Sequence, residues 1–283
     1  MSSFLPVPNP IAFKIFGLEI RWYAICIVLG IIAAVILCMK RTPIYGIEPE
    51  DRVLDMVLWV IPIGVVGARL YYCLFEWDSY KDDPISILYI HQGGLAIHGG
   101  LIFGLITAAI IAKKWGHGIL KWMDLIAPGI AIGQAIGRWG NYFNSEAHGT
   151  PTTLPWAIEV NGELVHPTFL YESIWCLLLC IFLCVFEKKR KKAFDGQIIC
   201  LYVILYSVER YFVEGLRTDS LWIGPFRQAQ VFSICAFVLG IVFCFVLRSR
   251  GRKKADGVKE SAQVPEQNDY TDISELVNKE DQQ

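Results

Sequence analysis

The chain has 283 residues, of which 54% are hydrophobic, and its mean hydropathy is +0.43. A soluble domain of this length needs much less apolar sequence, and uncharged runs of about twenty residues are typical of helices that cross a bilayer. The formal net charge of -1 indicates little about partners, because basic and acidic residues are segregated along the chain. No nucleic-acid partner is expected. Nearly all of the nine cysteines lie inside apolar runs. We therefore interpret them as small apolar side chains and predict neither a disulfide framework nor a cysteine metal site.

The hydropathy pattern predicts an all-α polytopic membrane protein with about seven spanning helices. The expected spans cover about residues 20–39, 53–75 and 94–112, a fourth that begins near residue 124, and then 168–186, 197–213 and 228–247. Residues 76–92 are polar and aromatic, so we expect them outside the membrane core. Residues 154–165 contain Asn161-Gly162 and predict a small hairpin. We expect residues 1–254 to form one membrane domain and the acidic segment 255–283 to be a disordered cytoplasmic tail.

Basic clusters recur at one side of the predicted topology, at residues 40–52, 113–121, 188–192 and 248–254. The positive-inside rule makes that side cytoplasmic. The N-terminus is then expected outside and the C-terminus in the cytoplasm. Five arginines lie within spans or near their outer ends, against this rule: Arg69, Arg138, Arg210, Arg217 and Arg227.

The segment 129–149 begins as an apolar helix and ends as a polar cluster. Gly129, Gly133 and Gly137 recur every fourth residue, which predicts a face that another helix can approach closely. A second stripe carries Gln134, Arg138, Asn141 and Ser145. An arginine and two amides on a membrane helix are costly unless they meet a partner or a polar ligand. We therefore favour a binding site over simple contacts between helices.

His98 lies among glycines in the first turns of a helix expected to begin on the outer side. The positive end of a helix favours neutral imidazole, which can accept a proton, so His98 is a candidate general base. Gly99 and Gly100 remove bulk where a ligand or another backbone comes close. The alternative is a structural histidine that is hydrogen-bonded to a neighbouring helix.

Two further segments carry charges at the outer ends of spans. Glu172 is expected to pair with one of the five arginines, and Arg210 is expected to pair with Glu214 four residues later. Arg217 and Arg138 together predict recognition of an anionic oxygen group, because arginine makes planar, bidentate contacts. The sequence contains no Gly-x-Ser-x-Gly, His-Glu-x-x-His or Walker-type motif.

Four motifs occur in order along the chain: His98-Gly-Gly, the segment from Gly137 to Gly149 that reads Gly-Arg-x-Gly-Asn-x-x-Asn-x-Glu-x-x-Gly, His166-Pro-Thr-x-Leu-Tyr-Glu, and Glu214-x-x-Arg-x-Asp. Together they resemble the bacterial prolipoprotein diacylglyceryl transferase family over about residues 11–247. The signature around Arg138 is long and specific, whereas the histidine motif alone is weak.

The resemblance implies a seven-span transferase of the bacterial inner membrane. Its partners would be the bilayer lipid phosphatidylglycerol and the lipobox segment of a preprolipoprotein. The sn-1,2-diacylglyceryl group would move to the lipobox cysteine thiol, forming a thioether and releasing glycerol phosphate, and no metal or organic cofactor is implied. Arg138 and Arg217 match the family's essential arginines and His98 its important histidine. The further site positions are Tyr23, Asn141, Asn144, Glu146 and Gly149.

Two points stay open at this level. The proton of the thiol can pass to His98, to Glu146 or to water. A transporter or flippase for an anionic lipid or solute is the alternative function, since polar residues and glycine-interrupted helices are also expected there. Against it, the sequence shows no internal repeat, and the polar residues cluster at one end of the spans.

Overall fold

The computed structural model describes residues 3–90, 93–189 and 194–263. Within these residues, seven long helices form the body of the protein: α1 (Trp22–Met39), α3 (Arg52–Phe75), α4 (Ile97–Lys114), α5 (Ile119–Phe143), α6 (Thr168–Lys189), α7 (Gln197–Leu216) and α8 (Gln228–Gln263). A short helix, α2 (Thr42–Tyr45), and two 3-10 helices, η1 (Trp77–Ser79) and η2 (Pro84–Leu88), lie in the loops. The predicted all-α polytopic architecture is confirmed.

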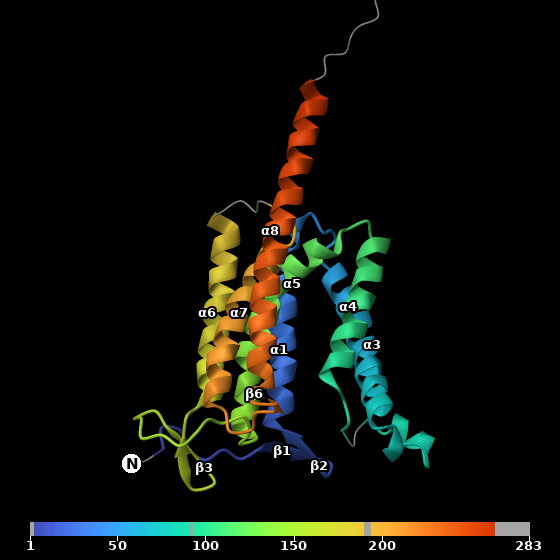
Figure 1. Cartoon of the computed structure of the whole chain (residues 1–283). Helices are drawn as coiled ribbons and strands as arrows, with labels where there is room; N and C mark the ends of the chain where they lie inside the picture. Colours follow the sequence, from blue (N-terminus) through green and yellow to red (C-terminus); the bar gives the residue numbers. More distant parts are fainter. Residues whose placement is uncertain (1–2, 91–92, 190–193, 264–283) are drawn as a thin grey trace, which may run out of the picture.

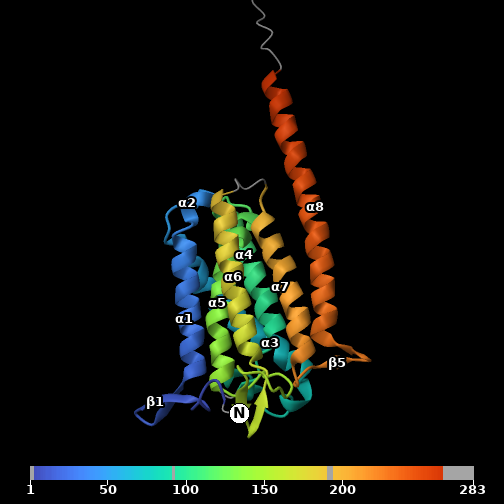
Figure 2. The same ribbon diagram turned by 90° about the vertical axis from the view of Figure 1, so that its left-hand side faces the viewer.

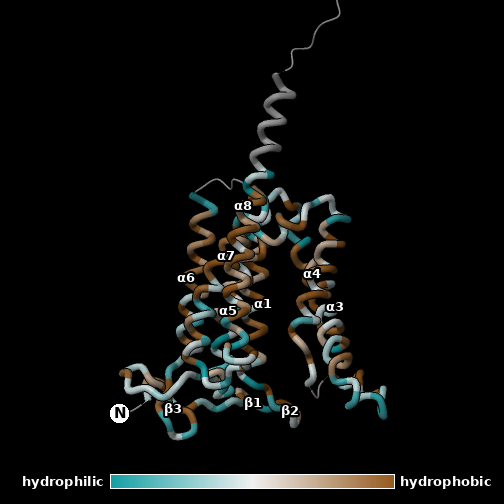
Figure 3. The backbone as a smooth tube through the Cα atoms, viewed as in Figure 1, coloured by the Kyte–Doolittle hydropathy of each residue, from teal (hydrophilic) through white to brown (hydrophobic). Residues whose placement is uncertain are grey.

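Six of the described helices are long and apolar enough to cross a membrane, and α7 is the long helix outside this set. The apolar residues of the bundle lie between two polar ends (Figure 3). Charged residues of α7 near its end, Glu209, Arg210 and Glu214, lower its hydropathy. Because α7 still packs against α5, α6 and α8, it belongs to the bundle, and the count of seven spans stays a prediction.

The helices fall into two groups. Figure 1 shows α3 and α4 beside the group of α1, α5, α6, α7 and α8. At one end a core cluster joins the two groups, with Cys38 on α1, Met56 on α3, Ala112 on α4 and Trp122 on α5. We call this end the basic end, since the described basic residues Lys40, Lys113, Lys188 and Arg248 occur there.

The opposite end, which we call the site end, carries three short antiparallel hairpins (Figures 1 and 2). They pair β1 (Ile11–Ile15) with β2 (Leu18–Arg21), β3 (Ile158–Val160) with β4 (Glu163–Val165), and β5 (Trp222–Ile223) with β6 (Phe226–Arg227). The predicted hairpin is confirmed as β3–β4. Its two turn residues, Asn161 and Gly162, have φ of 54° and 86°, as a type I′ turn requires.

The C-terminal helix α8 extends well past the basic end (Figure 2). It continues to Gln263, so helix covers the first residues of the segment 255–283, for which the sequence predicted disorder. Residues 264–283 lie outside the described residues, as do the basic residues 190–192 and the loop residues 91–92.

Candidate functional site

The glycine face of α5 packs against α1, as the four-residue spacing predicted. A Cβ on Gly133 would lie 3.5 Å from the Gly30 carbonyl oxygen, and a Cβ on Gly129 would lie 2.9 Å from the Cys38 sulfur. A Cβ on Gly137, by contrast, would meet no atom within 4 Å. The first two glycines therefore serve helix packing, whereas Gly137 faces open space next to Arg138.

The polar stripe of α5 faces α6 and α7. The Gln134 side-chain oxygen accepts a hydrogen bond from the Tyr202 hydroxyl at 2.8 Å. One turn later, Arg138 Nη2 lies 2.5 Å from Glu172 Oε2 of α6. The predicted ion pair of Glu172 with one of the five arginines is thus confirmed. Ser145, by contrast, lies beyond the end of α5 and is exposed.

Glu172 is the centre of the site. Its side chain is 1% exposed, while that of Arg138 is 21% exposed and can still be reached. The second oxygen, Oε1, lies 3.8 Å from Nη1 of Arg217, whose side chain is 14% exposed. Among the described residues, no donor makes a hydrogen bond of good geometry to either Glu172 oxygen. One carboxylate therefore stands between two arginines without using all of their N–H donors, so the arginines can also bind an added anion.

Arg217 is held in place by its own loop. Its Nε and Nη2 donate to the two carboxylate oxygens of Asp219 at 2.9 and 2.7 Å. Because Arg217 hydrogen bonds to Asp219, the pKa of that carboxyl is lowered. This fork fixes the plane of the guanidinium, and Nη1 remains directed toward Glu172.

Main-chain contacts join this loop to the segment that follows α5. Gly149 forms a β-bridge with Arg217, and the Thr150 amide donates to the Leu216 carbonyl at 2.8 Å. A Cβ on Gly149 would lie 2.6 Å from the Cβ of His166. Only glycine fits beside His166, and the β-bridge to Arg217 is formed on this closely packed segment of chain. Gly149 therefore acts by bringing the end of the α5 signature next to Arg217.

The remaining signature residues lie at the end of α5. Asn141 Nδ2 donates to Glu146 Oε1 at 2.8 Å, and the Asn144 side-chain oxygen is buried without a hydrogen-bond partner in the described chain. The ring of Tyr23 packs on Gly140, where a Cβ would come within 2.8 Å. The structure thus brings Tyr23, Asn141, Asn144 and Glu146 to the same end of α5 as Arg138.

His98 is not joined to this cluster. It is exposed near the start of α4, and its ring centroid lies 6.1 Å from that of Tyr71 on α3. No hydrogen bond or ion pair connects it to Arg138, Glu172 or Arg217 within the described chain. The adjacent Gly99 faces α3, where a Cβ would lie 2.3 Å from the Gly67 carbonyl oxygen. The sequence allowed either a ligand or another backbone to lie close to this glycine, and the structure places the backbone of α3 there.

The other three of the five arginines have structural partners. Arg69 donates to the main-chain oxygens of Ser86 at 2.7 Å and Ile87 at 2.8 Å, and so ties down the loop around η2. Arg210 Nη2 lies 2.5 Å from Glu214 Oε2, as predicted, and Arg227 donates to the Glu214 carbonyl. Arg138 and Arg217 are thus the pair that share Glu172.

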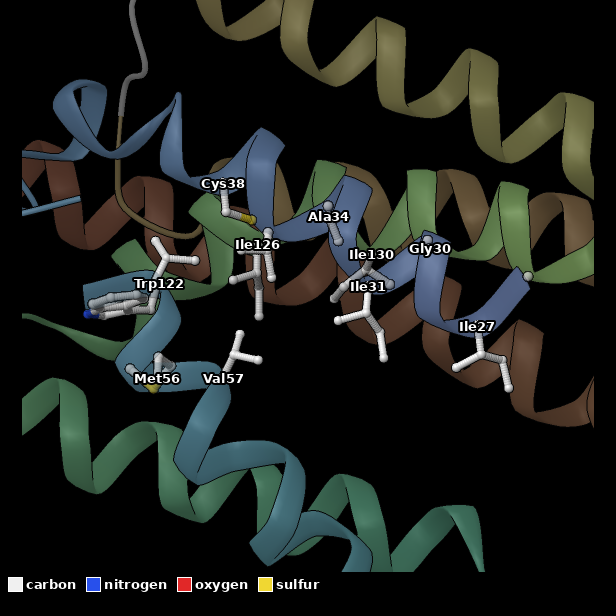
Figure 4. A pocket seen from close by; sticks show the side chains of 15 residues that line it. Ile27, Gly30, Ile31, Ala34, Cys38, Met56, Val57, Trp122, Ile126 and Ile130 are labelled. Carbon is white, nitrogen blue, oxygen red and sulfur yellow. The ribbon is translucent and has the colours of Figure 1, made fainter. Parts of the chain in front are cut away.

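An apolar cleft of about 330 Å³ opens between α1, α3 and α5 (Figure 4). It begins at Trp122 and Cys38 near the basic end, passes Ile31 and Ile130, and reaches Gly137. Since Gly137 precedes Arg138, the cleft extends along α5 to the level of that arginine.

Sequence reasoning missed one charged residue of the site region. Glu209 on α7 is 5% exposed, and Glu172 and Arg138 are among its electrostatic neighbours. The available signal was a carboxylate that follows the apolar run at the start of α7. No group of three or more His, Cys, Asp or Glu suited to a metal ion occurs among the residues that the structure describes.

Comparisons with known proteins agree on one family. The model of the family "Prolipoprotein diacylglyceryl transferase" matches residues 10–246. A phosphatidylglycerol–prolipoprotein diacylglyceryl transferase from Finegoldia magna is 50% identical over 82% of this chain and 93% of its own length. Proteins of the same name from Clostridioides difficile and Clostridium kluyveri are 46% and 45% identical, over 82% and 87% of this chain and 92% and 99% of their own lengths.

Proposed function

The chain belongs to the prolipoprotein diacylglyceryl transferase family, and from this premise we propose that Arg138 and Arg217 bind the phosphate of its lipid substrate. The protein is a transferase that moves the diacylglyceryl group of phosphatidylglycerol to prolipoproteins. The observation that carries the site proposal is Glu172, one buried carboxylate between two reachable arginines. No finding supports the transporter alternative.

The reaction needs an anion clamp. The lipobox thiol attacks the glycerol carbon that carries the phosphate ester, a carbon–sulfur bond forms, and the carbon–oxygen bond breaks. The electron pair leaves with the phosphate oxygen of glycerol phosphate, and the thiol proton passes to a base. Two guanidinium groups stabilise the negative charge that develops on the leaving group. Arg138 can exchange Glu172 for the phosphate. Arg217 can donate to the phosphate from Nη1, which lies 3.8 Å from Glu172 and makes no hydrogen bond to it.

The apolar cleft is suited to an acyl chain of the lipid, because its lining is apolar. We propose that an acyl chain of phosphatidylglycerol lies in the cleft between α1, α3 and α5, where apolar side chains replace the hydrocarbon of the bilayer. The chain would then extend from Arg138 toward the basic end. Gly137 faces the cleft without a neighbour, and it leaves room for the lipid to pass from the headgroup site into the groove.

His98 remains the proposed base, with Glu146 and water as alternatives. A free thiol with a pKa of about 8.5 is mostly protonated at neutral pH, so a base speeds formation of the thiolate. His98 is exposed near the start of α4 and lies beside Tyr71 of α3, so a thiol can reach it from outside the helix bundle. His98→Ala should lower turnover by about 10² to 10⁴ with lipid binding retained, and higher pH should restore part of the rate. Near-normal turnover at neutral pH would make His98 structural.

We also propose the orientation. The site end faces outward and the basic end faces the cytoplasm, because the lysine and arginine clusters gather at the basic end. A cysteine introduced at Thr152 should react with a membrane-impermeant thiol reagent added outside, and one at Lys188 should not. Labelling of the wild-type protein measures the reaction of the native cysteines, and this background is subtracted. The opposite labelling pattern would overturn both the orientation and the outward placement of the site.

The direct test uses purified protein in detergent, labelled phosphatidylglycerol and a lipobox peptide. Label should move to the peptide only when its cysteine is present, and glycerol phosphate should appear in equal amount. A peptide with serine at the cysteine position is the matched control. Absence of transfer by well-folded protein would contradict the activity, whereas transfer that survives loss of both arginines would contradict only the site.

A further inference from the structure

Glu209 is a buried carboxylate that the clamp described above does not use. It lies on α7 and is 5% exposed, and neither of its oxygens receives a hydrogen bond from the described residues. Its charged neighbours are Glu172 on α6, Arg138 on α5 and Arg210 on its own helix. Both arginines are already engaged, at 2.5 Å from Glu172 and from Glu214 respectively.

The charge of the cluster decides what this carboxyl can do. Side-chain contacts and electrostatic proximity join three arginines, Arg138, Arg210 and Arg217, to four carboxyl groups, Glu172, Glu209, Glu214 and Asp219. Arg227 is outside this cluster, because its contact with Glu214 is to the main-chain oxygen. With every group ionised the cluster is negative, although it has to attract a lipid phosphate. Among the four, Glu209 is the one to which the described residues offer neither an ion-pair contact nor a hydrogen bond, and burying an ion in that way is strongly unfavourable.

We propose that Glu209 is a positioning residue of the lipid site, which takes up a proton when the anionic headgroup binds to Arg138. Before the lipid arrives the ionised Glu209 makes the cluster negative and repels a phosphate that approaches Arg138. With the proton taken up, Glu209 is uncharged, the three arginines balance the three remaining carboxylates, and this repulsion is removed. This inference rests on the proposed role of Arg138 and adds a regulatory partner to it.

Other groups around Glu209 do not supply the same effect. From α5 it faces Arg138, from α6 Glu172 and Cys176, and from its own helix Tyr206 and Arg210. Helix α8, which packs on α7, has no charged residue from 228 to 247. Glu172 keeps two arginine partners, so Glu209 is the carboxyl that gains most from a proton.

Binding of the proton and of the headgroup are then coupled, and each favours the other to the same extent. A rise in pH removes the proton and weakens lipid binding. The KM for phosphatidylglycerol should therefore rise with pH in the wild type, by at least about fivefold, the lower end of typical coupling between sites. In Glu209→Gln, whose amide has the same shape and no charge, KM should stay low and nearly independent of pH.

The experiment measures kcat and KM for labelled phosphatidylglycerol in detergent, at a saturating lipobox peptide, from about pH 6 to about pH 9, between the ordinary pKa values of glutamate and lysine. Ionisation of the peptide thiol changes kcat in all variants alike, so KM is the informative quantity. Glu159→Gln is the matched control, because Glu159 is an exposed carboxylate on β3 at the same end, and it should follow the wild type.

Several results would overturn the proposal. They are a wild-type KM that does not change over this range, a Glu209→Gln variant whose KM still rises with pH, and a variant whose KM is raised at every pH. If Glu209→Gln does not fold, Glu209→Leu is measured. Failure of both, with Glu209→Asp intact, shows that an uncharged side chain cannot replace the carboxyl group, and this result also refutes the proposal. Failure of the clamp itself is distinguishable, because it appears as full transfer by Arg138→Lys.

Discussion

Two buried arginine–glutamate pairs, one at each end of the bundle, differ in how completely they are satisfied. At the basic end, Arg41 donates to both oxygens of Glu187, at 2.9 and 2.8 Å, and their side chains are 6% and 2% exposed. Arg41 also donates to the Leu125 carbonyl, and the Tyr45 hydroxyl donates to Glu187. At the site end, Arg138 touches one oxygen of Glu172, and no hydrogen bond of good geometry from the described residues reaches that carboxylate.

The same pair of residue types therefore performs two tasks. A buried ion pair stabilises a fold only when its remaining hydrogen-bonding capacity is used, and the pair of Arg41 meets this condition. The pair of Arg138 does not, so its arginine keeps donors for a ligand. The comparison shows that the site in this bundle is distinguished by an ion pair whose hydrogen-bonding groups are only partly used, more than by the presence of charge itself.

The largest expected effect breaks the pair at the basic end. Arg41→Ala leaves the charge of Glu187 buried without a partner, which costs about 3 to 5 kcal/mol. Unfolding in detergent, followed by circular dichroism, should show this loss of stability. The transfer rate per folded molecule should equal that of the wild type, since Arg41 is remote from the site. A lower rate in fully folded protein would show that the two ends are coupled.

A smaller effect is expected when the arginine of each pair becomes lysine. Arg138→Lys should fold normally and lose at least about tenfold in transfer rate, roughly 1.4 kcal/mol of barrier, because lysine lacks two donors in one plane. Arg41→Lys is the matched control and should keep its rate. The assay is transfer from labelled phosphatidylglycerol, and full activity of Arg138→Lys would remove this residue from the clamp.

The smallest effect is expected for the ion pair in which Asp219 holds Arg217. Because Arg217 lowers the pKa of Asp219 in the folded state, the pair stabilises the fold above the ordinary aspartate pKa of about 3.9. This stabilisation is lost as pH falls through the lowered folded-state value. Asp219 is 49% exposed, so solvent screening limits the contribution to about 1 kcal/mol or less. Asp219→Asn should show this deficit in unfolding free energy at neutral pH and none in acid; an equal deficit at both pH values would contradict the ion pair.

Local sequence was sufficient for much of the fold. Apolar runs about as long as a bilayer is thick predicted the long helices, and Asn161-Gly162 predicted the β3–β4 turn, because both depend on neighbouring residues alone. The glycine spacing of α5 predicted a packing face for the same reason, and Gly129 and Gly133 use it. The pairing of Arg210 with Glu214 follows from one helical turn.

Tertiary structure decided which of these residues meet. Glu172 lies 34 residues after Arg138, and only the packing of α6 against α5 selects it as the partner of that arginine. The separation of His98 from the arginines, and the burial of Glu209 beside them, depend equally on how helices pack. Periodicity tells which face of a helix a residue occupies, but the neighbour of that face is set by contacts between segments far apart in the chain.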